Sequence, residues 1–418
     1  MPREISSCRI CNNRQLVSLL HLGEQCLTGI FPKSPDEQIT RGPLELVKCD
    51  GADACGLVQL RHSYDSAEMY GADYGYRSSL NKSMVEHLRA KVAKLTAKVP
   101  PQPGDIVLDI GSNDGTLLSF YPPGPTAVGM DPTAAKFRKY YEPHIEVIAD
   151  FFSAANFKAR FGAGKAKLIT SIAMFYDLDE PMQFVAQVAE ILDDDGIWHF
   201  EQSYLPSMLA ANAYDTVCHE HVEYYALAQI KWMMDRCGLK IIAVELNDIN
   251  GGSFAVTVAK ASSRHREDTA AVAAMLAMEA SQGLHTLAPY QAFRERVFHH
   301  REALLALLAE LSRQGASVLG YGASTKGNVI LQFCGITTAQ IPFIAEVNPD
   351  KFGRFTPGTH IPIISETEAH AMKPDCLLVM PWHFKANLVQ REAAYLQRGG
   401  KMIFPLPEIQ IVGQQSGR

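Results

Sequence analysis

The segment PGDIVLDIGSNDGTLLSFY, residues 103–121, constrains the fold of this chain more than any other stretch. IVLDI is typical of a buried parallel strand, GSNDG of a glycine-bearing turn, and TLLSFY predicts the helix that follows. Gly111 and Gly115 let the backbone approach a ligand closely at the N-terminal end of that helix. The next strand, TAVGMD, ends in Asp131, which is placed to accept hydrogen bonds from ribose hydroxyls. This order of strand, loop, helix, strand and acid predicts an adenosine-binding doubly wound domain.

The spacing of the glycines indicates which cofactor binds. The order is D-x-G-x-x-x-G rather than G-x-G-x-x-G, so the loop does not support a pyrophosphate cradle. Asp109, just before the loop, can position a zwitterionic amino-acid tail, and this combination favours S-adenosylmethionine. Asp150, Phe151 and Phe152 follow a third strand, where an acid and two aromatic rings would flank an adenine. Later segments complete the order usual in methyltransferases; the alternative is an α/β domain that binds no cofactor.

Four cysteines near the N-terminus predict a metal site. Cys8 and Cys11 have the spacing of a zinc knuckle, and Cys49 and Cys55 follow further along the chain at a wider spacing. Four thiolates suit tetrahedral zinc and leave no position for water, so we expect the zinc to be structural rather than catalytic. The N-terminal segment has little core of its own, and a metal would stabilise it directly. The alternative is four ordinary buried cysteines.

A second glycine loop begins after residue 312. ASVLGYGASTKGNVILQFC predicts a strand, a loop with small residues, hydroxyls and a lysine, and then a helix. Such a loop suits a phosphate or pyrophosphate, although the order of a Walker loop is broken. Two nucleotide-type loops indicate one site for the cofactor and one for a nucleotide-linked substrate; the alternative is a second, structural α/β domain. The residues that we expect to bind this substrate are Tyr321, Ser324, Lys326, Asn328, Glu346, Asn348, Lys351 and His383.

Length and composition set the class and number of domains. A chain of 418 residues, 47% hydrophobic and 20% charged, is typical of a soluble α/β protein with two or three domains. We expect a small zinc-binding domain over residues 1–75 and a Rossmann-like S-adenosylmethionine domain over 76–261. A helical connection over 262–311 would then lead to a C-terminal Rossmann-like α/β domain over 312–418.

The same numbers argue against several classes of protein. A net charge of −6 disfavours nucleic-acid binding, and no apolar run approaches the ~20 residues that cross a bilayer. The first residues lack the apolar core of a signal peptide, and nine cysteines in a chain of this size do not indicate disulfides. We therefore expect a cytoplasmic protein and a monomer, without nucleic-acid or membrane partners.

The stretch CHEHVEYYAL, residues 218–227, is a dense group of side chains that can move protons. In an extended strand His219 and His221 would share one face, with Glu220 on the other. The stretch is a poor metal site, because the histidines lack i, i+4 spacing and His219 with Glu223 provides two ligands without a third. A polar loop that caps the next helix is the remaining alternative.

Five motifs occur in an order that resembles a known family: the four cysteines, DIGSNDG, CHEHVEYY, NDINGGSFAV and GYGASTKGN. Over residues 5–410 the chain is similar to the sugar C-methyltransferases of deoxysugar biosynthesis. This resemblance implies a zinc-binding domain, an S-adenosylmethionine domain and a domain that holds the nucleotide of an NDP-sugar. It also implies methyl transfer to C3 of an NDP-4-keto-6-deoxy sugar. Asp177 and Cys218 depart from the family pattern, which bears on the acceptor preference.

The resemblance also assigns residues to the site. Glu220 and His221 would lie at the reacting carbon, with Tyr76, Lys82 and Ser83 near it. With the loop residues, the full set that we expect around the cofactor is Tyr76, Lys82, Ser83, Asp109, Gly111, Asn113, Gly115, Asp131, Asp150, Phe151 and Phe152.

The chemistry of such a reaction defines what the residues must do. A ketone at C4 acidifies the hydrogen at C3, so the enzyme needs a base over that hydrogen and a donor or cation near the ketone oxygen. We expect His221 as the base, because the pKa of histidine lies near neutrality, with His219 as the rival. Glu220 would orient a ring nitrogen or contact the substrate, and Tyr76 and Tyr224 would donate to the enolate oxygen.

Two other functions stay open at this point. One is S-adenosylmethionine-dependent methylation of a different acceptor, such as a hydroxyl or a small ketone. The other is a non-enzymatic, zinc-containing module that senses S-adenosylmethionine. The second glycine loop favours a nucleotide-linked acceptor over both.

Overall fold

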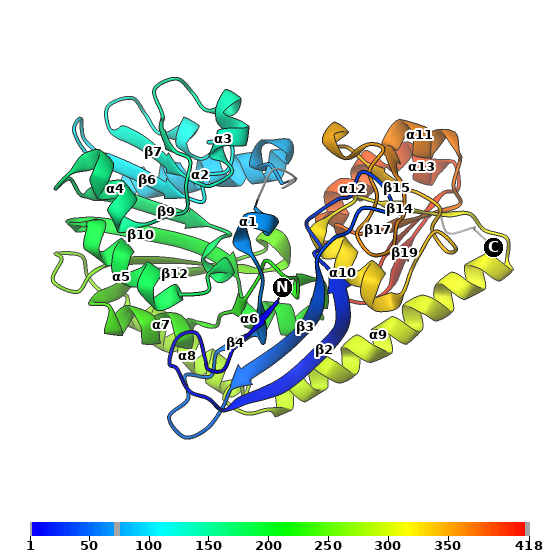
Figure 1. Cartoon of the computed structure of the whole chain (residues 1–418), viewed down its shortest axis with the longest axis horizontal. Coiled ribbons are helices and arrows are strands. Elements are labelled where there is room, and N and C mark those ends of the chain that lie inside the picture. Colours follow the sequence, from blue (N-terminus) through cyan, green and yellow to red (C-terminus); the bar gives the residue numbers. More distant parts are fainter. Residues whose placement is uncertain (1, 71–75, 414–418) are drawn as a thin grey trace.

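The computed structural model describes residues 2–70 and 76–413 as two α/β lobes with a curved N-terminal sheet between them (Figure 1). In the view of Figure 1 the central lobe lies on the left, the C-terminal lobe on the right, and the long helix α9, Ala288–Arg313, runs below. The two Rossmann-like sheets and the separate N-terminal sheet confirm the predicted fold class. Every helix among the described residues is too short or too polar to traverse a bilayer.

The central lobe is built on a seven-stranded sheet. Its strand order is β12 (Leu239–Asn247), β13 (Ser253–Lys260), β10 (Leu192–Ser203), β9 (Ala166–Ile172), β6 (Ile106–Ile110), β7 (Thr126–Met130) and β8 (Glu146–Ile148). The strands from β10 to β8 run parallel, and β13 and β12 extend the sheet antiparallel. All of β6 is buried, as expected for a parallel strand covered on both faces. The strand order reverses between β6 and β9, which is where such sheets bind ligands.

The helix predicted over residues 116–121 is wrong. The structure has only a short 3-10 turn there, η2, at Leu118–Phe120. Tyr121 is followed by Pro122 and Pro123, and a residue before proline is driven out of the helical region. Tyr121 accordingly has φ −71° and ψ 139°, which is extended backbone. The loop after β6 therefore ends in a turn rather than in a regular helix.

Helices flank the central sheet and connect it to the other parts of the chain. The first long one begins after Asn81, whose side chain accepts hydrogen bonds from the backbone N–H groups of Ser83 and Met84. The helices outside the C-terminal lobe, apart from α9, are α1 (Ser66–Met69), α2 (Lys82–Lys98), α3 (Ala134–Phe137), α4 (Ala154–Phe161), α5 (Pro181–Ile191), α6 (Leu205–Ala210), α7 (Leu227–Arg236) and α8 (Thr269–Ser281).

The C-terminal lobe has a six-stranded sheet. Its order is β16 (Ile363–Ser365), β15 (Ile344–Glu346), β14 (Val318–Tyr321), β17 (Cys376–Val379), β18 (Lys401–Phe404) and β19 (Gln410–Val412). All neighbouring strands are parallel except β19, which is antiparallel to β18. Its helices are α10 (Thr325–Cys334), α11 (Glu366–Ala371), α12 (Lys385–Arg391) and α13 (Ala393–Gln397). The glycine loop lies between β14 and α10, in the order that the sequence predicts.

The N-terminal sheet takes one strand from the centre of the chain. Its order is β11 (Glu223–Tyr224), β4 (Val58–Leu60), β3 (Arg41–Cys49) and β2 (Leu16–Cys26), and a separate pair is formed by β1 (Arg3–Glu4) and β5 (His62–Ser63). Because β11 lies within the CHEHVEYYAL stretch, the backbone of this stretch is fixed at Glu223 and Tyr224 by pairing to the N-terminal segment.

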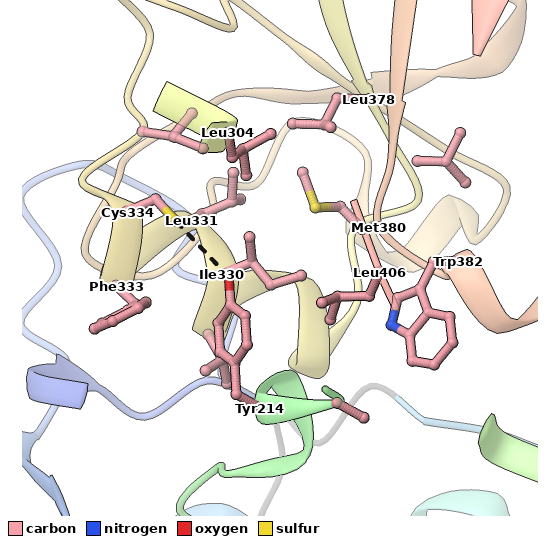
Figure 2. Packing of buried hydrophobic residues seen from close by; sticks show 14 of the residues in the cluster. Tyr214, Leu304, Ile330, Leu331, Phe333, Cys334, Leu378, Met380, Trp382 and Leu406 are labelled. Atoms are coloured by element: carbon pink, nitrogen blue, oxygen red, sulfur yellow. Dashed lines mark hydrogen bonds between the residues drawn. The ribbon is translucent and has the colours of Figure 1, made fainter. Parts of the chain in front are cut away.

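One hydrophobic core joins the N-terminal sheet, residues 205–224 and the C-terminal lobe. Figure 2 shows Tyr214 directed at α10 beside Ile330 and Phe333, and its hydroxyl lies 3.8 Å from Cys334 Sγ. Trp382, on the other side of this core, donates from Nε1 to Asp215 Oδ2 over 2.7 Å. Shared burial of this kind holds the lobes in fixed positions relative to each other.

Candidate active site

The four predicted cysteines come together in the N-terminal segment. Their four Sγ atoms lie within 4.8 Å of one another, and the Cys8–Cys55 and Cys11–Cys49 sulfur pairs are 3.5 and 3.4 Å apart. Zn–S bonds of ~2.3 Å in a tetrahedron place the sulfurs at about these separations. Asn13 donates from Nδ2 to Cys49 Sγ over 3.4 Å, which supports a thiolate there. The residues therefore fit a structural zinc ion.

A cavity of about 240 Å³ lies at the carboxyl ends of the central strands β6, β7 and β9. Seven of the residues predicted to bind the cofactor line it: Tyr76, Asp109, Gly111, Asn113, Asp131, Phe151 and Phe152. The other four predicted residues, Lys82, Ser83, Gly115 and Asp150, are not among the lining residues. The sequence analysis did not single out several side chains of the wall: Ser66, Tyr70, Ser78, Thr133, Met174 and Asp179.

The residues that stay outside the cavity have structural contacts instead. Ser83 donates from Oγ to Asn81 Oδ1 over 2.7 Å at the start of α2. Asp150 accepts from the backbone of Phe151 at Oδ1 and from Asn156 at Oδ2. A Cβ at Gly115 would lie 2.7 Å from the Tyr141 ring, so this glycine permits close packing beneath the loop.

Two carboxyl groups in the cavity have different environments. Asp131 accepts from the Asn113 N–H at Oδ2 over 2.8 Å and from the Thr133 N–H at Oδ1 over 2.6 Å, which orients it at the end of β7. Asp109 is bonded by the Thr170 hydroxyl over 2.5 Å, but burial, with repulsion from Asp131 added, raises its pKa to about 7. A cation bound beside Asp109 would relieve this cost. The wall therefore fits a ligand that carries an adenosine and a positively charged tail.

The CHEHVEYYAL stretch places its two histidines in different surroundings. His221 has Nδ1 3.0 Å from the Thr216 carbonyl oxygen and packs its ring against Tyr176. A carbonyl only accepts, so Nδ1 carries the proton, and the Nε2 lone pair accepts no hydrogen bond from the described residues. His219 is fully buried with its ring edge-on to Tyr64, and it lines neither this cavity nor the small one beside His221.

Burial keeps His221 neutral and places its pKa well below the near-neutral value expected from the sequence. Desolvation, with the charge of Lys326 added, lowers the pKa of His221 to about 3. A small cavity of about 10 Å³ borders the ring and is also lined by Glu223 and Tyr224. The Tyr224 hydroxyl donates to the same Thr216 carbonyl over 3.3 Å, so this predicted donor is already engaged.

Acidic side chains surround the stretch. Glu220 accepts from the Thr28 hydroxyl at Oε2 over 3.2 Å, and burial raises its pKa. Asp177 lines the large cavity, and burial together with the charge of Glu220 raises its pKa well above the usual range. Its Oδ1 has no hydrogen-bond partner among the described residues. Asp177 is thus a wall residue of the cofactor cavity that feels the charge of Glu220.

Thr28 and Gly29 are contacts of Glu220 that the sequence analysis missed. A Cβ on Gly29 would lie 2.2 Å from Glu220 Oε1, so only glycine fits there without displacing the carboxylate. No local motif marks these residues as part of the site, because they reach it through the fold of the N-terminal segment.

The predicted substrate residues of the C-terminal lobe do not form one group. Tyr321 is buried and donates to Glu392 over 2.5 Å, and Asn328 donates to the Thr28 carbonyl over 2.7 Å. Ser324 caps α10 by accepting from the Gly327 N–H. Lys326 donates to the Asn250 carbonyl over 3.1 Å, toward the central lobe.

The remaining predicted substrate residues lie at the strand ends of this lobe. Lys351 donates to the Ala323 carbonyl over 2.7 Å and lies 3.9 Å from Glu346. Asn348 accepts from the Asp350 N–H, and Nδ1 of the half-buried His383 has no hydrogen-bond partner among the described residues. Burial lowers the pKa of His383 to about 3, with Lys326 adding to the effect.

Comparison with known proteins decides the family. Three family models match in succession: "Putative zinc binding domain" over residues 8–70, "Methyltransferase domain" over 84–244 and "C-methyltransferase C-terminal domain" over 248–407. C-methyltransferase NovU of Streptomyces niveus is 31% identical over 99% of this chain and 98% of that protein. The chain belongs to the C-methyltransferase family. This C-methyltransferase uses S-adenosylmethionine and has a structural zinc site at its four cysteines, as predicted.

Solved structures resemble the C-methyltransferase over less than half of its length. An O-methyltransferase family protein of Burkholderia thailandensis covers 47% of this chain and 63% of its own, at 19% identity and a TM-score of 0.36. The plantazolicin methyltransferase BpumL, in complex with a triazolic analogue and SAH, covers 44% of this chain and 87% of its own, at 12% identity and a TM-score of 0.36. The family assignment rests on the sequence matches.

Proposed function

We propose that this C-methyltransferase methylates C3 of an NDP-4-keto-6-deoxy sugar through an enolate, with His221 as the base. The observation that carries the proposal is the state of His221: neutral, with Nδ1–H fixed on the Thr216 carbonyl and Nε2 free to accept a proton. A C–H bond becomes acidic enough for such a base when a ketone lies next to it. Asp177 lines the cofactor cavity, and the charge of Glu220, next to His221 in the chain, acts on its carboxyl.

The residues of the large cavity would hold the cofactor. Asp131 would accept from the ribose hydroxyls, Asp109 would face the charged tail, and Phe151 and Phe152 would flank the adenine. Bound there, S-adenosylmethionine supplies an electrophilic methyl group. Tyr76 lines the same cavity and would border the acceptor. Lys82, Ser83, Gly115 and Asp150 are not among the residues that line the cavity, so we assign them no contact with the cofactor.

The C-terminal lobe would hold the nucleotide of the acceptor. Glu346, Asn348, Lys351 and His383 lie at the carboxyl ends of its strands or just beyond them, where doubly wound sheets bind nucleotides. The glycine loop before α10 lies at the same edge. A single chain would thus provide both sites, in keeping with the expected monomer.

A panel of acceptors tests this proposal. Purified protein is incubated with methyl-labelled S-adenosylmethionine and NDP-4-keto-6-deoxy sugars that differ in nucleotide and in the groups at C2 and C3. We expect a product with a new carbon-bound methyl group at C3 by NMR. The matched control is the same sugar with the C4 ketone reduced to a hydroxyl, which should not react because nothing acidifies C3–H. An O-methylated product, or equal reaction of the reduced sugar, would point to the alternative acceptor class.

A further inference from the structure

The loop that begins α10 in the C-terminal lobe lies directly against the catalytic stretch. Asn328 donates to the Thr28 carbonyl, and the Thr28 hydroxyl donates to Glu220. A Cβ built on Gly29 would approach Glu220 Oε1 at 2.2 Å and Thr325 Oγ1 at 3.6 Å. The first residues of α10 and the Glu220 carboxyl therefore border the same small space.

The packing around this space keeps the two sides together. Tyr214 and Trp382 join the lobes through a shared core (Figure 2). Trp382 also donates a hydrogen bond to Asp215. Asp215 and His221 belong to one short continuous segment, so the bond that holds Asp215 also restrains the position of His221. A side chain that crosses from α10 to this segment is therefore held at a fixed place relative to His221.

Lys326 is the side chain that extends from α10 to the central lobe. Its ammonium donates to the carbonyl of Asn250, in the turn between β12 and β13 of the central lobe, over 3.1 Å. An ammonium has three N–H donors, so two remain for other acceptors. Its positive charge acts on Asp215, Cys218, His221 and His383, which places it among the groups that surround the base.

We propose that Lys326 is a catalytic residue that stabilises the enolate oxygen of the acceptor, rather than a ligand of its phosphates. This inference rests on the proposed function and names the cation that the chemistry requires. When His221 Nε2 takes the C3 proton, the electrons of the C–H bond form the C3=C4 double bond and the carbonyl electron pair moves to oxygen. With S-adenosylmethionine bound, the C3=C4 pair would form the new bond from C3 to the methyl group, the oxygen pair would return to the carbonyl, and the sulfur would keep the electrons of the broken bond, with the proton left on His221 Nε2.

A fixed ammonium fits this task better than the tyrosines that the sequence nominates. Tyr224 already donates to the Thr216 carbonyl, and Tyr76 is half-exposed at the large cavity. A cation placed where negative charge develops lowers the barrier without reorganising during the reaction, an effect of ~10²–10³ in rate for one donor. The positive charge of Lys326 also disfavours protonation of His221 before the ketone acceptor binds.

Lys326→Met tests the inference against a phosphate-binding role. We expect kcat to fall ~10²–10³-fold, with the KM for the NDP-ketosugar changed by less than about threefold. Exchange of C3–H with heavy water should slow in parallel. The acid limb of the pH–rate profile should move to higher pH, because the pKa of His221 rises when the neighbouring charge is removed. Lys326→Arg keeps the charge and should restore that limb.

The matched control is Lys401→Met, which removes the same charge from an exposed position on β18 of the same lobe and should change neither constant. Affinity for S-adenosylmethionine shows that each variant is folded; if Lys326→Met fails to bind it, Lys326→Gln is measured in its place. A raised KM at unchanged kcat, or unchanged exchange, overturns the inference while the proposed function stands. Absence of exchange and of methylation in the wild-type protein would remove both.

Discussion

Two arginines that share the partner Asp179 differ in burial, and this difference predicts their effects on stability. The Arg9 side chain is 3% exposed and lies 3.5 Å from Asp179 and 3.7 Å from Glu223, whereas the Arg3 side chain is 68% exposed and lies 3.1 Å from Asp179. Arg9 also donates to Gln59, the Leu60 carbonyl and Ser63. Arg9 therefore provides hydrogen bonds to buried polar groups of the N-terminal segment, whereas the Arg3 side chain lies at the surface.

Arg9→Met should destabilise the N-terminal sheet by about 3–4 kcal/mol, because it leaves three buried acceptors without their hydrogen-bond donor at ~1–3 kcal/mol each; burial already raises the pKa of Glu223 well above its usual range, so that carboxyl would stay protonated without Arg9. Arg3→Met should cost about 0–1 kcal/mol, as exposed pairs do. The assay is backbone hydrogen exchange of β3 and β4 by mass spectrometry, which reports local opening. Exchange should be ~10²–10³-fold faster in Arg9→Met than in the wild type. Equal effects of the two substitutions would refute the reasoning.

Three other predictions address zinc, the cofactor and the catalytic stretch. Cys8→Ser should lose zinc by elemental analysis, whereas Cys237→Ser, outside the cluster, should retain it. Affinity for S-adenosylmethionine, measured by calorimetry between pH ~6 and ~8, should weaken as the pH falls below about 7, by up to ~tenfold per pH unit, because the Asp109 carboxyl must lose its proton to face a cation; Asp109→Asn should abolish this dependence. Gly29→Ala should lower kcat ~10²-fold by displacing Glu220, with cofactor affinity unchanged; equal kcat would show that Glu220 need not be held there.

The parts of the molecule that the sequence predicts well depend on local patterns. IVLDIGSNDG predicts a buried strand and a ligand loop, and the structure places Asp109, Gly111 and Asn113 at the cavity because they lie at the end of one strand and directly after it. The cysteine cluster is predictable for a different reason, since four thiolates have few uses other than a metal. The prediction of a helix over residues 116–121 is wrong because the two prolines that follow disfavour helical backbone before them, although the segment itself is apolar.

The parts that the sequence does not predict depend on contacts between distant segments. Nothing near Thr28 or Gly29 indicates that Glu220 will meet them, and the pairing of β11 with β4 joins residues far apart in the chain. Lys326 has the sequence context of a phosphate loop, yet its ammonium donates to Asn250 in the other lobe. Its surroundings follow from how the two lobes pack, which a local motif cannot specify.

The exchange of the C3 hydrogen with heavy water tests the central claim most directly. The protein is incubated with an NDP-4-keto-6-deoxy sugar in heavy water without S-adenosylmethionine, and deuterium at C3 is followed by NMR. Wild-type protein and His219→Asn should both incorporate deuterium, whereas His221→Asn should not, because His221 borders a cavity with its Nδ1–H fixed on Thr216, while His219 is fully buried and lines neither cavity. Exchange retained in His221→Asn and lost in His219→Asn would contradict the assignment of the base.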